Sequence, residues 1–120
     1  MNISLLKTGG IDYEEGIGRF VGNSELYESL LKSFCEENDF DKAKAAVEAG
    51  DTRNLFELIH TMKGVTGNLS LTPLYRACCE LTEKLRAEDY SDLKVHFDTV
   101  YKIYTETVRT ISAATEESDL

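Results

Sequence analysis

Apolar residues recur at one-turn helical spacing along most of this chain. No segment alternates apolar and polar residues in the manner of a half-buried strand. Helices with one apolar side must bury those sides against one another, so the pattern favours a helical bundle. The three most regular stripes comprise Leu26, Tyr27, Leu30, Leu31, Phe34 and Cys35, then Leu74, Ala77, Cys78, Leu81 and Leu85, and finally Leu93, Phe97, Val100, Tyr104, Val108 and Ile111.

Capping signals divide the pattern into helical segments. Asp12 with Glu15 forms a capping-box pattern, residues 50–52 read Gly-Asp-Thr, and Thr72-Pro73 places a proline at a first helical position. Because the connections are short, we expect an all-α, antiparallel four-helix bundle with short accessory N-terminal helices. The expected helices cover about 12–20, 24–37, 40–49, 52–69, 73–87 and 92–114.

The length and composition indicate one domain. A chain of 120 residues with 42% hydrophobic content is long enough for one core and too short for two ordinary domains. We therefore expect a single domain over residues 1–120. Its ends, at about 1–10 and 115–120, are expected to be flexible, and the second of these is polar and acidic.

The charge balance excludes two classes of partner. Lys and Arg total 13 against 22 Asp and Glu, a formal net charge of -9, which repels nucleic acid and anionic membrane surfaces. No apolar run approaches the roughly 20 residues that cross a bilayer, and the first residues lack an export pattern. The expected location is the cytoplasm.

The three cysteines favour packing over chemistry. Cys35, Cys78 and Cys79 are odd in number and form no CxxC pair. Two adjacent cysteines are poorly placed to bind one metal ion together or to form a disulfide with each other. We interpret all three as small apolar side chains in a reducing compartment.

One histidine lies on the polar side of its helix. On a helical wheel with Ile59 at zero, the apolar stripe of residues 55–69 is centred near -65°. His60 falls at about +100°, Gly67 at about +80°, Gly64 at about +140° and Lys63 at about +40°. His60 and both glycines therefore point away from the expected core.

The two glycines need an explanation, since each costs a helix roughly 1 kcal/mol relative to alanine. Because glycine has no side chain, another protein could approach His60 closely over these two positions. One alternative is that Gly64 ends the helix, although Val65 and Leu69 continue the apolar stripe. For Gly67, an equally good alternative is a left-handed helix cap.

The residues around His60 suggest phosphoryl chemistry. An exposed imidazole offers an unprotonated nitrogen at neutral pH, and Lys63 supplies a positive charge one turn away. Phe56, one turn before His60, is a candidate for an apolar docking surface. The alternative for Phe56 is burial under the leading helix that carries Ile17 and Phe20.

Other chemistries lack their residues. His60 has no His, Cys or carboxylate at i±4 for a metal site, and His96 has no lysine or glycine companions. The chain contains no GxxxxGK[ST] loop, so we expect no use of ATP. A hydrolase would need a nucleophile and an enclosed pocket, which a convex helix face does not supply.

The segment IHTMKGVTGNLSL resembles the active-site helix of histidine-containing phosphotransfer domains. That pattern is a histidine, then Lys-Gly three and four residues on, then Asn-Leu, and it matches here at His60, Lys63, Gly64, Asn68 and Leu69. The upstream IDYEEGIGRFVGNSELYESLLKSF is also similar to the family's first helices. The sequence departs from the pattern at Thr66, where alanine is common, and at Ser70, where glycine is frequent.

The resemblance implies a phosphocarrier that is not an enzyme. Its His60 would accept a phosphoryl group from a receiver-domain aspartyl phosphate and pass it to another receiver, with Lys63 stabilising the phosphate. Gly64, Gly67 and Phe56 would meet the partner, a receiver of a response regulator or hybrid histidine kinase. Any Mg²⁺ would belong to the receiver, and no cofactor is expected. The alternative is a noncatalytic module that binds a receiver or a kinase.

Overall fold

The computed structural model describes residues 1–118, which form seven α-helices and no β-strand. The only strand-like feature in this part of the chain is one isolated antiparallel bridge between Ile11 and Leu71. The all-α prediction is therefore confirmed. The helices are α1 (Ile3–Thr8), α2 (Tyr13–Arg19), α3 (Ser24–Phe34), α4 (Asp39–Ala49), α5 (Thr52–Asn68), α6 (Thr72–Arg86) and α7 (Leu93–Ser118).

Local capping chemistry sets most helix starts. The side chains of Asp12, Asn23 and Asp51 each accept a hydrogen bond from a main-chain N–H three residues on, at the starts of α2, α3 and α5. Gly50 ends α4 with a φ of 69°, a left-handed conformation that glycine adopts without strain. Helix α6 begins at Thr72, one residue earlier than expected, with Pro73 in its first turn.

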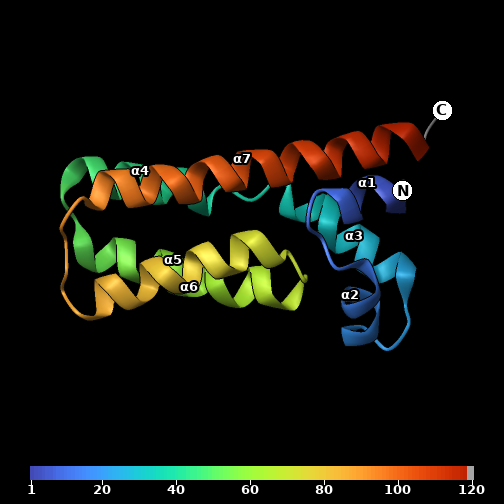
Figure 1. Cartoon of the computed structure of the whole chain (residues 1–120), viewed down its shortest axis with the longest axis horizontal. Coiled ribbons are helices and arrows are strands. Elements are labelled where there is room, and N and C mark those ends of the chain that lie inside the picture. The colour runs from blue at the N-terminus through green and yellow to red at the C-terminus, as the bar shows by residue number, and fades with distance from the viewer. Residues whose placement is uncertain (119–120) are drawn as a thin grey trace.

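Helices α4 to α7 enclose the main core. Each packs on two others, α4 on α5, α5 on α6, α6 on α7, and α7 back on α4, which closes the expected antiparallel bundle. Figure 1 shows α7 running along the whole molecule, with α4 beside its first half and the α5–α6 pair beneath it. Fully buried side chains such as Phe40, Leu55, Ile59 and Phe97 fill the space between them.

The N-terminal residues differ from the expectation of a flexible end. Residues 3–8 form α1, which packs on the C-terminal half of α7 (Figure 1). The side chain of Leu6 is fully buried, and the main-chain N–H of Asn2 donates to the carbonyl oxygen of Ala114 at 2.9 Å. Helix α7 is longer than expected and ends at Ser118, so only residues 119 and 120 of the proposed flexible tail lie outside the described part.

Helices α2 and α3 hold the end of α5. The Tyr27 hydroxyl donates to the carbonyl oxygen of Leu69 at 2.7 Å, and the N–H of Asp12 donates to the carbonyl oxygen of Ser70 at 3.0 Å. Gly16 makes room for this contact, because a Cβ at that position would lie 2.2 Å from the Tyr27 ring. The short N-terminal helices therefore hold the end of α5, which comes one turn after Gly64 and directly after Gly67.

The cysteines are unpaired, as expected for packing residues. Cys78 is fully buried, and burial raises the pKa of its thiol to about 12, so the thiol stays protonated at neutral pH. Cys35 and Cys79 are half-buried. Within residues 1–118, none of the helices combines the length and the apolar character that a bilayer crossing requires.

Candidate functional site

His60 lies on the outer face of α5, as the helical wheel predicts. Its side chain is exposed, whereas Ile59 before it and Met62 after it are buried in the core. The face is set by helical geometry, since residues about 100° apart on the wheel point to different sides. The imidazole is therefore open to an approaching molecule and has no enclosing pocket.

Phe56 supports the imidazole from the preceding turn. The two rings are nearly parallel, with centroids 5.7 Å apart and an interplanar angle of 4°. The guanidinium carbon of Arg86, on α6, lies 5.8 Å from the centre of the Phe56 ring, and the same guanidinium pairs with Glu83. Phe56 is half-buried and keeps an accessible part beside His60.

The alternative that the leading helix covers Phe56 is wrong. Helix α2 packs on α1 and α3, and its Glu15 reaches Ser70 at the opposite end of α5. The aromatic side chain of α2's C-cap, Phe20, stacks on Tyr27 instead, with ring centroids 5.9 Å apart. Whether Phe56 docks a partner stays a prediction.

Gly64 lies in open space one turn after His60. A Cβ built at this position would have no neighbouring atom within 4 Å, and the residue is exposed. Helix α5 continues to Asn68, so the alternative that Gly64 ends the helix is wrong. No contact inside the described protein explains the choice of glycine, which leaves the approach of a partner as an explanation.

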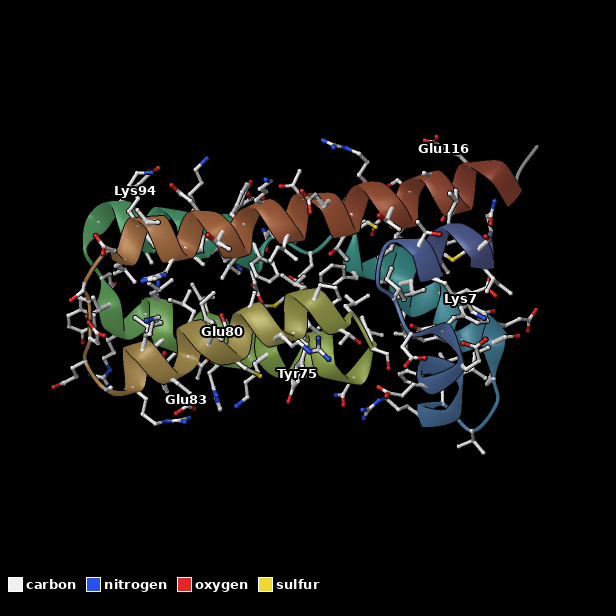
Figure 2. All side chains as sticks on the ribbon, viewed as in Figure 1. Lys7, Tyr75, Glu80, Glu83, Lys94 and Glu116 are labelled. Carbon is white, nitrogen blue, oxygen red and sulfur yellow. The ribbon has the colours of Figure 1, made fainter. Side chains whose placement is uncertain are left out.

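Gly67 has a different reason to be small. A Cβ there would lie 3.0 Å from both Cδ1 and Cε1 of Tyr75, closer than nearly all real contacts of this kind. Gly67 is half-buried inside α5 and is not among the residues with positive φ, so it is not a left-handed cap. We expected that packing would not explain a glycine at position 67, and this expectation is wrong. The missing side chain makes room for the Tyr75 ring of α6. Figure 2 shows Tyr75 on α6, toward the end nearer α2.

A hollow of about 500 Å³ opens beside the glycines, where α2, α5 and α6 meet. Its walls mix small residues with charged ones. Lys63 is half-buried on the rim of the hollow, and Arg76 is exposed. The residues that matter for its chemistry are Glu15, Arg19, Lys63, Gly64, Tyr75 and Arg76.

Charges around this hollow are only partly compensated. Glu15 accepts hydrogen bonds from the Ser70 hydroxyl at 2.9 Å and from Arg19 at 3.2 Å. These two bonds, the Ser70 bond first, lower the pKa of the Glu15 carboxyl, which favours its charged form. Neither Lys63 nor Arg76 takes part in an ion pair with any residue in the range 1–118.

The two departures from the family pattern are accommodated inside the fold. Thr66 is fully buried, and its hydroxyl donates to the carbonyl oxygen of Met62 at 2.8 Å, which satisfies it within the helix. Ser70 has a φ of 55°, the left-handed region that glycine favours. Its buried hydroxyl bonds to Glu15, which ties this strained residue to α2.

The described residues contain no group of three or more His, Cys, Asp or Glu side chains that could hold a metal ion. His96 is half-buried on α7, at the margin of the apolar stripe where the sequence places it. Four residues that matter for the chemistry of the hollow were not predicted from the sequence as site residues: Glu15, Arg19, Tyr75 and Arg76. They come from helices other than α5, so the pattern around His60 held no signal for them.

A helical bundle that presents one histidine on an open helix face, with a lysine and a clear position beside it, has the form of a carrier that exchanges a group with another protein. A family model described as the Hpt domain matches residues 29–114, which include all of α4, α5 and α6. The chain therefore belongs to the Hpt domain family. The comparisons with curated proteins and with solved structures found no match.

Membership of the Hpt domain family implies a class of activity. Hpt domains are phosphocarriers of phosphorelays that interact with receiver domains, and they are not kinases that use ATP. The matched range begins inside α3, so α1 and α2 lie outside it. The side of the hollow formed by α2 is thus supplied by residues beyond the family match.

Proposed function

We propose that this protein is a phosphorelay intermediate in which His60 accepts a phosphoryl group from a receiver-domain aspartyl phosphate and passes it to a second receiver. One observation carries the proposal most directly: the exposed imidazole of His60 is followed, one turn on, by the open position of Gly64. The cleared surface lets a reacting group on another protein approach the ring closely.

The chemistry follows from the exposed ring. The ring nitrogen farther from the backbone, Nε2, attacks the phosphorus in line, and a P–N bond forms while the P–O bond to the aspartate breaks. The aspartate leaves as a carboxylate. Transfer to the next receiver is the same step in reverse, with a receiver carboxylate as the attacking group.

Lys63 balances the charge of the transferring group in this proposal. Its ammonium is not engaged by a carboxylate of the described chain, so it is available to the phosphoryl oxygens. Phe56 limits the orientations of the imidazole through ring stacking and offers apolar area beside it. Any Mg²⁺ is supplied by the receiver.

Further parts of the proposal concern the setting of the protein. Residues 1–120 act as one phosphotransfer domain, and its partners are receivers of response regulators or hybrid histidine kinases. The location is cytoplasmic, which the three unpaired cysteines support because thiols persist in a reducing compartment.

The test is transfer of labelled phosphate from a panel of phosphorylated receiver domains to the wild-type protein and to His60→Gln. Acid-labile label on the wild type alone supports the proposal, since phosphohistidine is lost in acid. Absence of label with every receiver, in protein shown by circular dichroism to be folded, would favour the noncatalytic binding module instead.

A further inference from the structure

Three cations face the hollow beside Gly64, although the chain as a whole is strongly acidic. Arg19 comes from α2, Lys63 from α5 and Arg76 from α6, against a single lining carboxylate, Glu15. The whole chain carries 13 basic and 22 acidic side chains. The hollow therefore reverses the charge balance of the protein at one place.

The single carboxylate does not neutralise this group. Glu15 is already held by Arg19 and by the Ser70 hydroxyl, so its charge is committed to the α2 side of the hollow. Lys63 and Arg76 remain without an ion-pair partner in the described part of the chain. Two free cations across a hollow attract an anionic group.

The hollow is next to the phosphoryl-transfer position. Gly64, which lines it, follows His60 by one helical turn, a rise of about 6 Å along the helix axis. No side chain at Gly64 separates the two places. A protein that brings a reacting group to His60 over Gly64 therefore also covers the hollow.

The hollow is held in shape by contacts that do not involve a partner. Asp12 bonds through its N–H to the Ser70 carbonyl oxygen, and Tyr27 bonds to the Leu69 carbonyl oxygen, which together fix α2 against the end of α5. On the other side, the Tyr75 ring lies against Gly67. Arg19 and Arg76 are thus carried by elements whose positions are set before any partner arrives.

We propose that this hollow is a recognition subsite for a carboxylate side chain on the receiver that docks at His60, with Arg76 as its main cationic contact and Arg19 as the second, while Lys63 stays with the phosphoryl group and adds only to the positive potential. The proposal rests on the proposed function and names a contact within it. Before docking, the hollow is open to water, which screens a free anion; a covering protein excludes that water and strengthens the ion pair. A guanidinium can hold a carboxylate through two parallel hydrogen bonds.

This subsite would also select among receivers. Arg19 lies on α2, before residues 29–114, the range that the family model matches, so part of the contact comes from the N-terminal helices. A receiver with a neutral or basic residue at the matching place would leave the cations unpaired under the interface, which costs affinity.

The experiment compares two phosphodonors. A phosphorylated receiver must dock to transfer its phosphoryl group, whereas phosphoramidate is small and reaches His60 without docking. With Arg76→Glu, we expect the rate of transfer from the receiver at low ionic strength to fall about tenfold or more, and its dependence on salt to weaken. The rate with phosphoramidate should stay within about twofold of the wild type.

Arg109→Glu is the matched control, because it makes the same charge change at an exposed position on α7, in a surface hollow lined also by Leu5 and Thr8 of α1. It should leave both rates close to those of the wild type. Restoration of the Arg76→Glu rate by a receiver in which one acidic residue is changed to arginine would identify the partner carboxylate and support the proposal.

Several results would overturn the subsite. One is a rate of transfer from the receiver that Arg76→Glu leaves unchanged, and another is an equal fall in that rate for Arg76→Glu and Arg109→Glu. A third is a fall in the rate of Arg76→Glu with both donors, which would assign Arg76 to the reaction at His60. Saturable binding of inorganic phosphate to the free protein, abolished by Arg76→Glu, would make the hollow a small-anion site. Failure of the wild type to be labelled by either donor would instead contradict the proposed function itself.

Discussion

The hydroxyl of Tyr27 donates a 2.7 Å hydrogen bond to the main-chain carbonyl oxygen of Leu69, which lies 42 residues further along the chain. Tyr27 is fully buried on α3, and Leu69 is the residue that caps α5. The bond satisfies a carbonyl group that the helix leaves without an internal partner. It therefore joins the N-terminal helices to the end of the helix that presents His60.

Removal of this bond should destabilise the protein without changing its shape. Tyr27→Phe keeps the ring and leaves the Leu69 carbonyl oxygen buried without its donor, so we expect a loss of about 1–3 kcal/mol in the free energy of unfolding. Urea unfolding followed by circular dichroism measures it. Tyr90→Phe, at an exposed tyrosine between α6 and α7, is the control and should change stability by less than about 0.5 kcal/mol.

Two glycines of α2 should respond oppositely to alanine. A Cβ at Gly16 would lie 2.2 Å from the Tyr27 ring, so Gly16→Ala should cost about 1–3 kcal/mol of stability as the ring is displaced. Gly18 has no atom within 4 Å of its position for a Cβ, and Gly18→Ala should stabilise α2 by up to about 1 kcal/mol. Thermal unfolding of the two variants would settle this, and equal effects would contradict the packing described for Tyr27.

A side chain at Gly64 should affect the partner and not the fold. Gly64→Gln enters open space on α5, and glutamine is the better helix former by up to about 1 kcal/mol, so stability should be kept or raised. Phosphoryl transfer from a receiver should slow, because the added side chain stands beside His60. Labelling by phosphoramidate is the control and should be unaffected. A receiver rate equal to that of the wild type would reject the steric explanation of Gly64.

The carboxyl of Glu15 should report on its bond to Ser70. Because the Ser70 and Arg19 bonds lower its pKa in the folded protein, Ser70→Ala should move that pKa up toward its ordinary value. A carbon-detected NMR titration of the glutamate side chains measures the change. If the pKa of Glu15 is the same in both proteins, the Ser70 bond does not form in solution.

The direction of the pH effect on stability follows from the same shift. A carboxyl whose folded pKa is below its unfolded pKa stabilises the fold fully above the unfolded value and ceases to do so as the pH falls through the folded value. Glu15 is exposed, so its contribution is small and is screened by salt. The part of the stability difference between wild type and Ser70→Ala that depends on the Glu15 charge should accordingly vanish in strong acid.

Much of the fold was predictable because its signals are local. The apolar stripes of α3, α6 and α7 and the caps at Asp12, Asn23 and Asp51 need only residues within a few turns of one another. The expectation of a flexible end at residues 1–10 did not anticipate α1, because this helix buries Leu6 and packs on α7, at the other end of the chain. No local pattern carries that information.

The candidate site divides in the same way. The sequence by itself determined that His60 faces outward, with Lys63 and Gly64 beside it, since one helix's periodicity decides the direction of its side chains. Only the tertiary structure decided that Gly67 receives the Tyr75 ring, while Gly64 faces open space. It also brought Arg19 and Arg76 to the hollow beside Lys63. The reason is physical: these neighbours come from different helices, and their approach depends on how the bundle packs, which the spacing of residues along one helix does not encode.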